Sequence, residues 1–106
     1  MAFTMKTGDT SPILQATFTD ASGSAVSIVG ATVKLIVADL SNTVVMNKTM
    51  TVFDGSNGIA EYEWQSGDTS TSGTYKVEFE VTYSTGEVET FPNTGYEMLV
   101  IKEDLG

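Results

Sequence analysis

The sequence predicts an all-β protein, and three of its features agree on that fold class. Threonine and valine, which favour strands, are abundant, with sixteen threonines in 106 residues. Several segments alternate apolar and polar residues with a period of two, as a strand with one buried face does. Clusters of Gly, Asn, Asp and Ser separate these segments at strand-length intervals, which is typical of a sandwich or a barrel.

The length and composition indicate a single domain over residues 1–106 and exclude several classes of function. A chain of 106 residues can bury about two-thirds of its surface, which is enough for a stable core without disulfides or metal ions. The chain contains no cysteine and no histidine, which excludes disulfides, thiolate or imidazole metal sites and catalysis based on either residue. The net charge of −9 argues against nucleic acid as a partner, because phosphate binding needs positive charge. We expect no cofactor.

Neither a membrane partner nor export is expected from the hydropathy pattern. No apolar run approaches the ~20 residues of a membrane span. The first residues also lack the charged and apolar regions of a signal peptide. We therefore expect synthesis in a cytoplasm.

In the first half of the chain we expect strands at residues 12–19 and 31–38 and a weaker one at 43–53. The first strand places Leu14 and Phe18 on one face and mostly polar residues on the other. The second alternates in the same way. Because the pattern weakens in the third segment, we expect one bent or interrupted strand there.

In the second half we expect strands at residues 59–65, 74–83, 87–91 and 96–102. The second of these alternates strictly over ten residues, which is the clearest strand pattern in the chain. Pro92 cannot donate to a ladder, so we expect a break at residues 91–95, at a sheet edge or a bulge. The expected core is the inward-facing set Leu14, Phe18, Val33, Leu35, Tyr62, Trp64, Val77, Phe79 and Val81.

The residues before the clearest strand have the layout of a tyrosine corner. In that device a tyrosine near the start of strand F turns its hydroxyl back to the backbone of the preceding loop. Tyr75 is the candidate tyrosine, Gly73 permits the close approach, and Asp68 is placed to cap loop N–H groups. The alternative is that Tyr75 is simply the first inward aromatic residue of its strand. Together with the regular spacing of short strands and turns, the tyrosine corner predicts an immunoglobulin-like antiparallel β-sandwich of about seven or eight strands without a disulfide.

Carboxylates are the remaining candidates for catalysis. Glu61 and Glu63 share one strand face, and Glu78 and Glu80 share a face of the next strand. A glycosidase needs a pair of acids in which one carboxyl is buried and has a raised pKa. These four lie opposite aromatic and aliphatic faces, where both members of each pair are solvated. The pattern therefore predicts solvated sheet faces, and we expect no enzyme.

Two weaker patterns have structural explanations that we favour. Asp54 and Asn57 offer oxygen ligands for calcium, but their loop lacks the alternating acids of an EF-hand, so a hairpin turn is expected. Tyr62 and Trp64 would stack on a sugar if they faced solvent. Their alternation with glutamates predicts that both face the core instead.

Apolar residues at unexpected places indicate a surface that binds protein. Ile13 and Ile36 lie on the nominal outer faces of their strands, and the last strand is apolar on both sides. A strand buried on both faces in so small a domain indicates packing against something else. The alternative is that loops or residues 1–6 cover it. The candidate interface residues are Phe3, Met5, Ile13, Ile36, Met98, Leu99 and Ile101.

Several short motifs, in their order and spacing, resemble one phage family. They lie at residues 6–14, 30–33, 54–64, 67–69, 73–75, 78–83 and 89–93. Together they span nearly the whole chain and resemble the N-terminal domain of siphophage baseplate upper proteins and related small immunoglobulin-like virion proteins.

This resemblance implies a non-enzymatic bacteriophage virion structural protein. It implies a homo-oligomer that docks to other virion proteins and has no catalytic residues. Its place would be the virion, after synthesis in the host cytoplasm, with tail, baseplate and capsid-decoration roles open. The alternative class is a cell-surface adhesion or carbohydrate-binding module with the same fold, whose partner is a cell-surface glycan.

Overall fold

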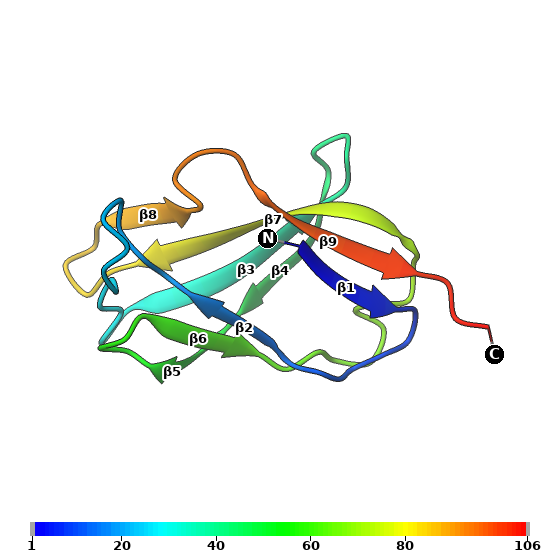
Figure 1. Ribbon diagram of the computed structural model, residues 1–106, viewed down its shortest axis with the longest axis horizontal. Helices are drawn as coiled ribbons and strands as arrows, with labels where there is room; N and C mark the ends of the chain where they lie inside the picture. Colours follow the sequence, from blue (N-terminus) through cyan, green and yellow to red (C-terminus); the bar gives the residue numbers. More distant parts are fainter. Residues whose placement is uncertain (1, 106) are drawn as a thin grey trace.

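The computed structural model describes residues 2–105, which form nine strands and the turns between them (Figure 1). Within this range no helix has the length and apolar character that a membrane span requires. The strands are β1 (Ala2–Lys6), β2 (Leu14–Thr17), β3 (Thr32–Ala38), β4 (Val44–Thr49), β5 (Thr51–Asp54), β6 (Ile59–Tyr62), β7 (Gly73–Thr82), β8 (Val88–Phe91) and β9 (Glu97–Lys102).

The strands form two sheets, and the predicted all-β sandwich is confirmed. The larger sheet has the order β1-β9-β7-β3-β4 with β8 beside β7, and the smaller has the order β2-β6-β5. Two additions raise the strand number above the expected seven or eight. Residues 2–6 form a strand of their own, and the segment 43–53 is divided at the buried Met50, where the chain passes between sheets.

One pair of strands departs from the antiparallel arrangement that we expected. β1 lies parallel to β9, whereas the other strand pairs are antiparallel. No hairpin joins β1 to β9, so the tight turn that makes neighbours antiparallel is absent between them. Where both strands end, Thr7 N donates to Lys102 O at 2.8 Å.

The expected break near Pro92 separates two strands that lie along the same edge of β7. β8 pairs with residues 79–82 of β7, and β9 pairs with residues 73–77. Residues 92–96 leave the sheet between them and form the orange loop that joins β8 to β9 in Figure 1. The missing N–H of Pro92 therefore falls where no ladder bond is needed.

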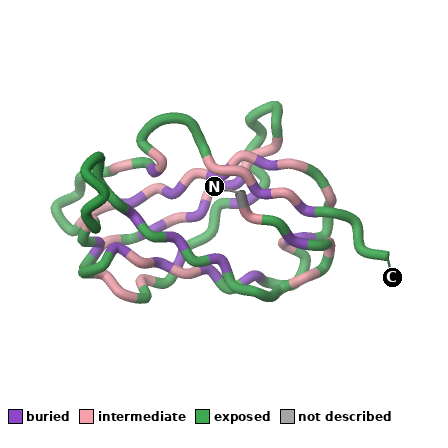
Figure 2. Tube along the Cα trace, viewed as in Figure 1, coloured by how far each residue is buried: buried purple, intermediate pink, exposed green. Residues whose placement is uncertain are grey.

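The core lies between the two sheets and contains all nine residues predicted for it. Buried and partly exposed positions alternate along the strands (Figure 2). Phe18 contacts Phe79 and Phe91 with ring centroids 5.6 and 4.9 Å apart, which joins β2 to the larger sheet. Tyr62 and Trp64 meet edge to face at 5.4 Å.

Candidate functional site

Three of the predicted interface residues belong to the core instead. Met5, Leu99 and Ile101 are buried, so the prediction that they form an interface is wrong. The reason is the pairing of β1 with β9, which places β9 inside the sheet, so that its alternate residues face the smaller sheet. The smaller sheet thus covers Leu99 and Ile101, whereas Met98 and Val100 remain half-buried on the outer face of the larger sheet.

The other four predicted interface residues retain some exposed surface. Ile36 and Met98 are half-buried on the outer face of the larger sheet. Ile13 is 43% exposed just before β2, and Phe3 is half-buried at the side of the sandwich. Ile36 and Met98 share a face, but Ile13 and Phe3 lie elsewhere, so the four residues do not form one patch.

The loop before β7 contains the hydrogen bond that defines a tyrosine corner. The hydroxyl of Tyr75 donates to the carbonyl oxygen of Thr71 at 2.8 Å. Gly73 has φ of 151°, and a Cβ at that residue would lie 3.5 Å from the Tyr75 hydroxyl. The ring therefore lies close over Gly73, and the bond ties the start of β7 to the loop.

Asp68 anchors the other end of this loop. Its carboxylate accepts hydrogen bonds from the hydroxyl of Tyr62 and, at 2.8 Å, from the backbone N–H of Gln65. Burial, followed by the bond to Asp68, raises the pKa of Tyr62. The loop is thus fixed at both ends by a tyrosine. The contact of Tyr62 with Asp68 could not be predicted from the sequence, because a six-residue spacing across a loop gives no periodic signal.

The four glutamates lie on outer sheet faces, apart from the aromatic core. Glu61, Glu78 and Glu80 are half-buried and Glu63 is exposed. Glu61 accepts a hydrogen bond from the side chain of Gln15 at 2.8 Å across the β2–β6 pair. Within residues 2–105 no group of three or more acidic, histidine or cysteine side chains is placed to hold a metal ion. This arrangement offers a polar sheet surface and no paired-acid cleft.

The oxygens of Asp54 are used within its own turn. The carboxylate accepts from the Asn57 amide at 2.8 Å and from the Ser56 hydroxyl at 3.2 Å. These bonds lower the pKa of Asp54, and the bond from Asn57 has the largest effect. Asp54 and Asn57 therefore satisfy each other as partners in a hairpin turn.

Two turns of the chain have the same Asp-centred geometry. Asp20 Oδ1 accepts from Ser22 Oγ at 2.7 Å and from Ser24 N at 3.0 Å. Asp39 Oδ1 accepts from Ser41 Oγ at 2.7 Å and from the backbone of residue 43 at 3.0 Å. In both turns the pKa of the aspartate is lowered, and the hydrogen bond from the serine hydroxyl contributes most to this shift. The repeated geometry is a turn device and explains both clusters of Ser, Asn and Gly.

We expect these two turns to make stability depend on acid pH. A carboxyl with a folded-state pKa below its unfolded value stabilises the fold above the unfolded pKa, and this contribution is lost as pH falls through the folded pKa. The double variant Asp20→Asn, Asp39→Asn should therefore lose less stability than the parent when the pH is lowered from 5 toward 3. Urea unfolding at several pH values measures the two slopes. Equal slopes would contradict the role of these aspartates.

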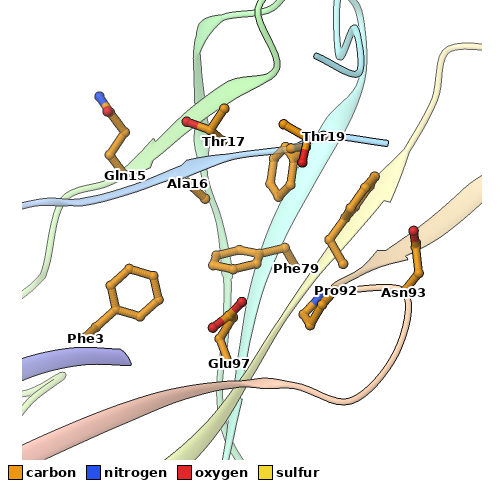
Figure 3. A pocket seen from close by; sticks show the side chains of 11 residues that line it. Phe3, Gln15, Ala16, Thr17, Thr19, Phe79, Pro92, Asn93 and Glu97 are labelled. Carbon is orange, nitrogen blue, oxygen red and sulfur yellow. The ribbon is translucent and has the colours of Figure 1, made fainter. Parts of the chain in front are cut away.

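An aromatic groove of about 430 Å³ opens at the side of the sandwich, between β2 of the smaller sheet and β1, β8 and β9 of the larger. Figure 3 shows Phe3, Phe79 and Glu97 extending into this space opposite Ala16 of β2. The groove is lined by Phe3, Gln15, Ala16, Thr17, Phe18, Thr19, Phe79, Phe91, Pro92, Asn93 and Glu97. Its lining is thus aromatic at the centre and polar at the rim, and its charged member is acidic.

The backbone of β2 borders this groove with polar groups that no strand within residues 2–105 pairs. Phe18 N donates to the carbonyl oxygen of Gly58, just before β6, at 2.8 Å. Along an antiparallel pair, the backbone N–H and C=O groups of successive residues point alternately toward and away from the partner strand. The N–H and C=O groups of Gln15 and Thr17 therefore point away from β6, toward the groove side. An unpaired edge beside an apolar groove can take an added strand, with backbone bonds on one side and side-chain pockets on the other.

The opposite wall of the groove is held by a hydrogen-bond network at β8. The Tyr83 hydroxyl donates to Glu89 at 2.6 Å, and the Asn93 amide donates to the same carboxylate at 3.0 Å. Burial and the bond to Glu89 raise the pKa of Tyr83 to about 12. The groove has no signal in the sequence, because its walls come from strands far apart in the chain. The predicted strand break at Phe91 and Pro92 lies at the groove.

Comparisons with known proteins show the fold. No protein-family model matches the chain, and no curated protein matches it. Among solved structures, the crystal structure of CopC from Methylosinus trichosporium OB3b matches with a TM-score of 0.56 and 12% sequence identity. The match covers 98% of this chain and 86% of that one. Over nearly its whole length, then, this chain has a β-sandwich fold like that of CopC.

Proposed function

We propose that this chain is a non-enzymatic structural protein of a bacteriophage particle that acts by binding other particle proteins and itself. The observation that carries the proposal is the aromatic groove beside the unpaired edge of β2. The motif resemblance described above supports the phage context. Synthesis in the host cytoplasm and a place in the tail, baseplate or head belong to the same proposal.

Strand addition is the binding mechanism that suits the groove. A partner strand would bond to the outward backbone groups of Gln15 and Thr17 and extend the smaller sheet. Its alternate side chains would then enter the groove over Phe79 and Phe91. Glu97 lines the far wall, and Glu89 lies behind the lining residue Asn93, to which it is bonded. These acids favour a partner strand that carries Lys or Arg.

The net charge of −9 has a role in this mechanism. Like charge on free copies opposes their random association and keeps them soluble before assembly. A partner with a basic segment would be attracted by the same charge. We therefore expect attachment to weaken as salt is added.

The carbohydrate-binding alternative has less support from the geometry. Tyr62 and Trp64 are buried, so neither ring can stack on a sugar. The exposed aromatic residues Phe53 and Tyr96 belong to different parts of the sandwich, at β5 and before β9, and do not form a row. No aromatic platform for a glycan arises from these residues.

A proline on the β2 edge tests the proposed function. Thr17 is exposed and its N–H points outward, so Thr17→Pro removes one bond to an added strand while the β2–β6 bonds remain. The probe is a particle preparation from a phage that encodes this chain, made with the gene deleted. In co-sedimentation we expect saturable attachment of the parent and at least about tenfold weaker attachment of Thr17→Pro.

The matched control is Thr17→Ala, which keeps the N–H and should attach like the parent. Circular dichroism establishes that both variants are folded. A parent protein that never sediments with the particles contradicts the proposed function. A Thr17→Pro variant that attaches as tightly as the parent contradicts strand addition at β2.

A further inference from the structure

The turn between β5 and β6 contains the one asparagine of the chain that precedes a glycine. The asparagines at residues 42, 47 and 93 precede threonine or lysine, whereas Asn57 precedes Gly58. An asparagine cyclises when the next backbone nitrogen attacks its side-chain amide carbon, and glycine hinders this attack least because it has no Cβ. Asn57 is exposed, so water can reach the product of that attack. The turn therefore holds the reactants of a deamidation.

Deamidation at this residue needs only groups of the chain and one water molecule. The backbone nitrogen of Gly58 bonds to Cγ of Asn57 and gives up its proton, while Nδ2 takes up a proton and leaves as ammonia. A five-membered cyclic imide remains. Water then adds to one of the two imide carbonyl carbons, and the ring C–N bond at that carbon breaks. One opening leaves aspartate, and the other leaves isoaspartate, which adds a methylene to the main chain.

Two hydrogen bonds hold the reacting groups in the folded protein. The attacking nitrogen, Gly58 N, donates to the carbonyl oxygen of Gly55 at 3.1 Å. The leaving nitrogen, Asn57 Nδ2, donates to Asp54 Oδ2 at 2.8 Å, which directs the amide back toward Asp54. Attack requires the side chain of Asn57 to rotate onto Gly58 N, and this rotation breaks the bond to Asp54. The reaction is therefore restrained while the turn is closed and proceeds when the turn opens locally.

Asp54 also precedes a glycine, but its carboxyl group is the poorer target. A carboxylate repels a nucleophile, and the imide forms readily only from the protonated acid. The hydrogen bonds from Asn57 and Ser56 lower the pKa of Asp54, so its ionised form persists. Reaction at Asn57 should therefore precede reaction at Asp54.

The product would disturb a close contact between this turn and the end of β2. The carbonyl oxygen of Gly58 accepts from Phe18 N at 2.8 Å, and a Cβ on Gly58 would lie 2.5 Å from the carbonyl oxygen of Val26. A methylene added just before Gly58 would displace it from this packed position. A carboxylate at residue 57 would also face that of Asp54, where the amide now donates a hydrogen bond. Both changes weaken the attachment of Phe18, which lines the aromatic groove.

We propose that Asn57 is a site of spontaneous deamidation, restrained in the folded protein by Asp54 and by the carbonyl group of Gly55. Conversion of Asn57 to isoaspartate loosens the end of β2. The reaction takes place within the chain, so its test uses the isolated protein and does not depend on the proposed function.

Incubation in mildly alkaline buffer, followed by peptide mass spectrometry, tests the site. We expect conversion at Asn57 before conversion at any other asparagine, and at least about tenfold faster conversion in urea that unfolds the protein. Asn57→Gln should stay unmodified at this residue over the same period, because its longer side chain must close a six-membered ring. Earlier conversion at another asparagine, or equal rates in folded and unfolded protein, would overturn the proposal.

Asp54→Ala and its matched control Ser56→Ala test the restraint. Both remove the hydrogen bond between Ser56 and Asp54, but only Asp54→Ala also frees the amide of Asn57. Folded Asp54→Ala should convert about tenfold faster than the parent, as expected for the loss of one hydrogen bond to a charged group. Ser56→Ala should convert at the parent rate, and equal rates for both variants would show that Asp54 does not restrain the amide.

If Asp54→Ala does not fold, the parent decides the question. Its conversion rate should rise as urea approaches the unfolding midpoint, because the turn then opens more often. A rate that stays constant up to the midpoint would overturn the restraint.

Urea unfolding of the converted protein measures the structural consequence. Anion exchange separates converted from parent protein by the added negative charge, and labelling with an isoaspartate methyltransferase identifies the isoaspartate form. We expect this form to have a lower urea midpoint than the parent and than Asn57→Asp, which adds the charge without the methylene. An isoaspartate form that unfolds at the parent midpoint would show that the turn does not hold the end of β2.

Discussion

Replacing Phe18 with alanine is expected to lower the free energy of unfolding by about 3–5 kcal/mol. Phe18 is 2% exposed, and its ring lies against Phe79 and Phe91. The variant would leave a cavity between the two sheets at the inner end of the aromatic groove. Because a domain of this size is stable by about 5–15 kcal/mol, the loss is a large part of the total.

Urea titration followed by circular dichroism measures this effect, and Phe53→Ala is the matched control. Phe53 is the same residue type at 63% exposure, so its removal should change stability by less than about 0.5 kcal/mol. Similar midpoints for the two variants would show that Phe18 does not join the sheets as described. Because Phe18 also lines the groove, binding should be measured for this variant only where it remains folded.

The second large effect is expected from Gly58→Ala, with a loss of about 3 kcal/mol. Gly58 has φ of +68°, a conformation that is unfavourable for alanine. A Cβ there would also lie 2.5 Å from the carbonyl oxygen of Val26 and 2.8 Å from that of Phe18. Both contacts are with backbone, so alanine fits only if the chain at Phe18 and at Val26 shifts.

Gly67→Ala separates the clash from the conformational effect. Gly67 has φ of +91° but no atom within 4 Å of the added Cβ, so about 1 kcal/mol is expected from strain alone. The difference between the two variants in thermal or urea unfolding measures the clash. If both variants lose equal stability, the close approach at Gly58 has no energetic consequence.

The strands and their inward faces could be predicted because each follows from local spacing. The alternating segment 74–83 corresponds to β7, and its apolar side chains lie between the two sheets. The loop before it was also accessible, because a glycine two residues before a tyrosine is a local signal. These features need only the next few residues of the chain to be understood.

Pairing between distant segments could not be predicted in this way. The apolar pattern of residues 96–102 indicates that both sides are covered but not what covers them. The smaller sheet covers one side of this strand, and β1, which is about ninety residues away in sequence, lies beside it and parallel to it. The groove has the same origin, because Phe3, Gln15 and Glu97 come together only when both sheets form.

The parallel pairing of β1 with β9 also determines how the domain bears a load. Ala2 lies opposite Met98 and Lys6 lies opposite Lys102, so the two strands enter and leave side by side in the same direction. Tension applied at Ala2 and Lys102 would slide one strand along the other, and the bonds of the whole pair would resist together. In an antiparallel terminal pair pulled from one end, those bonds would open one after another. The two terminal strands thus form a shear joint, an arrangement suited to a component that transmits force through an assembly.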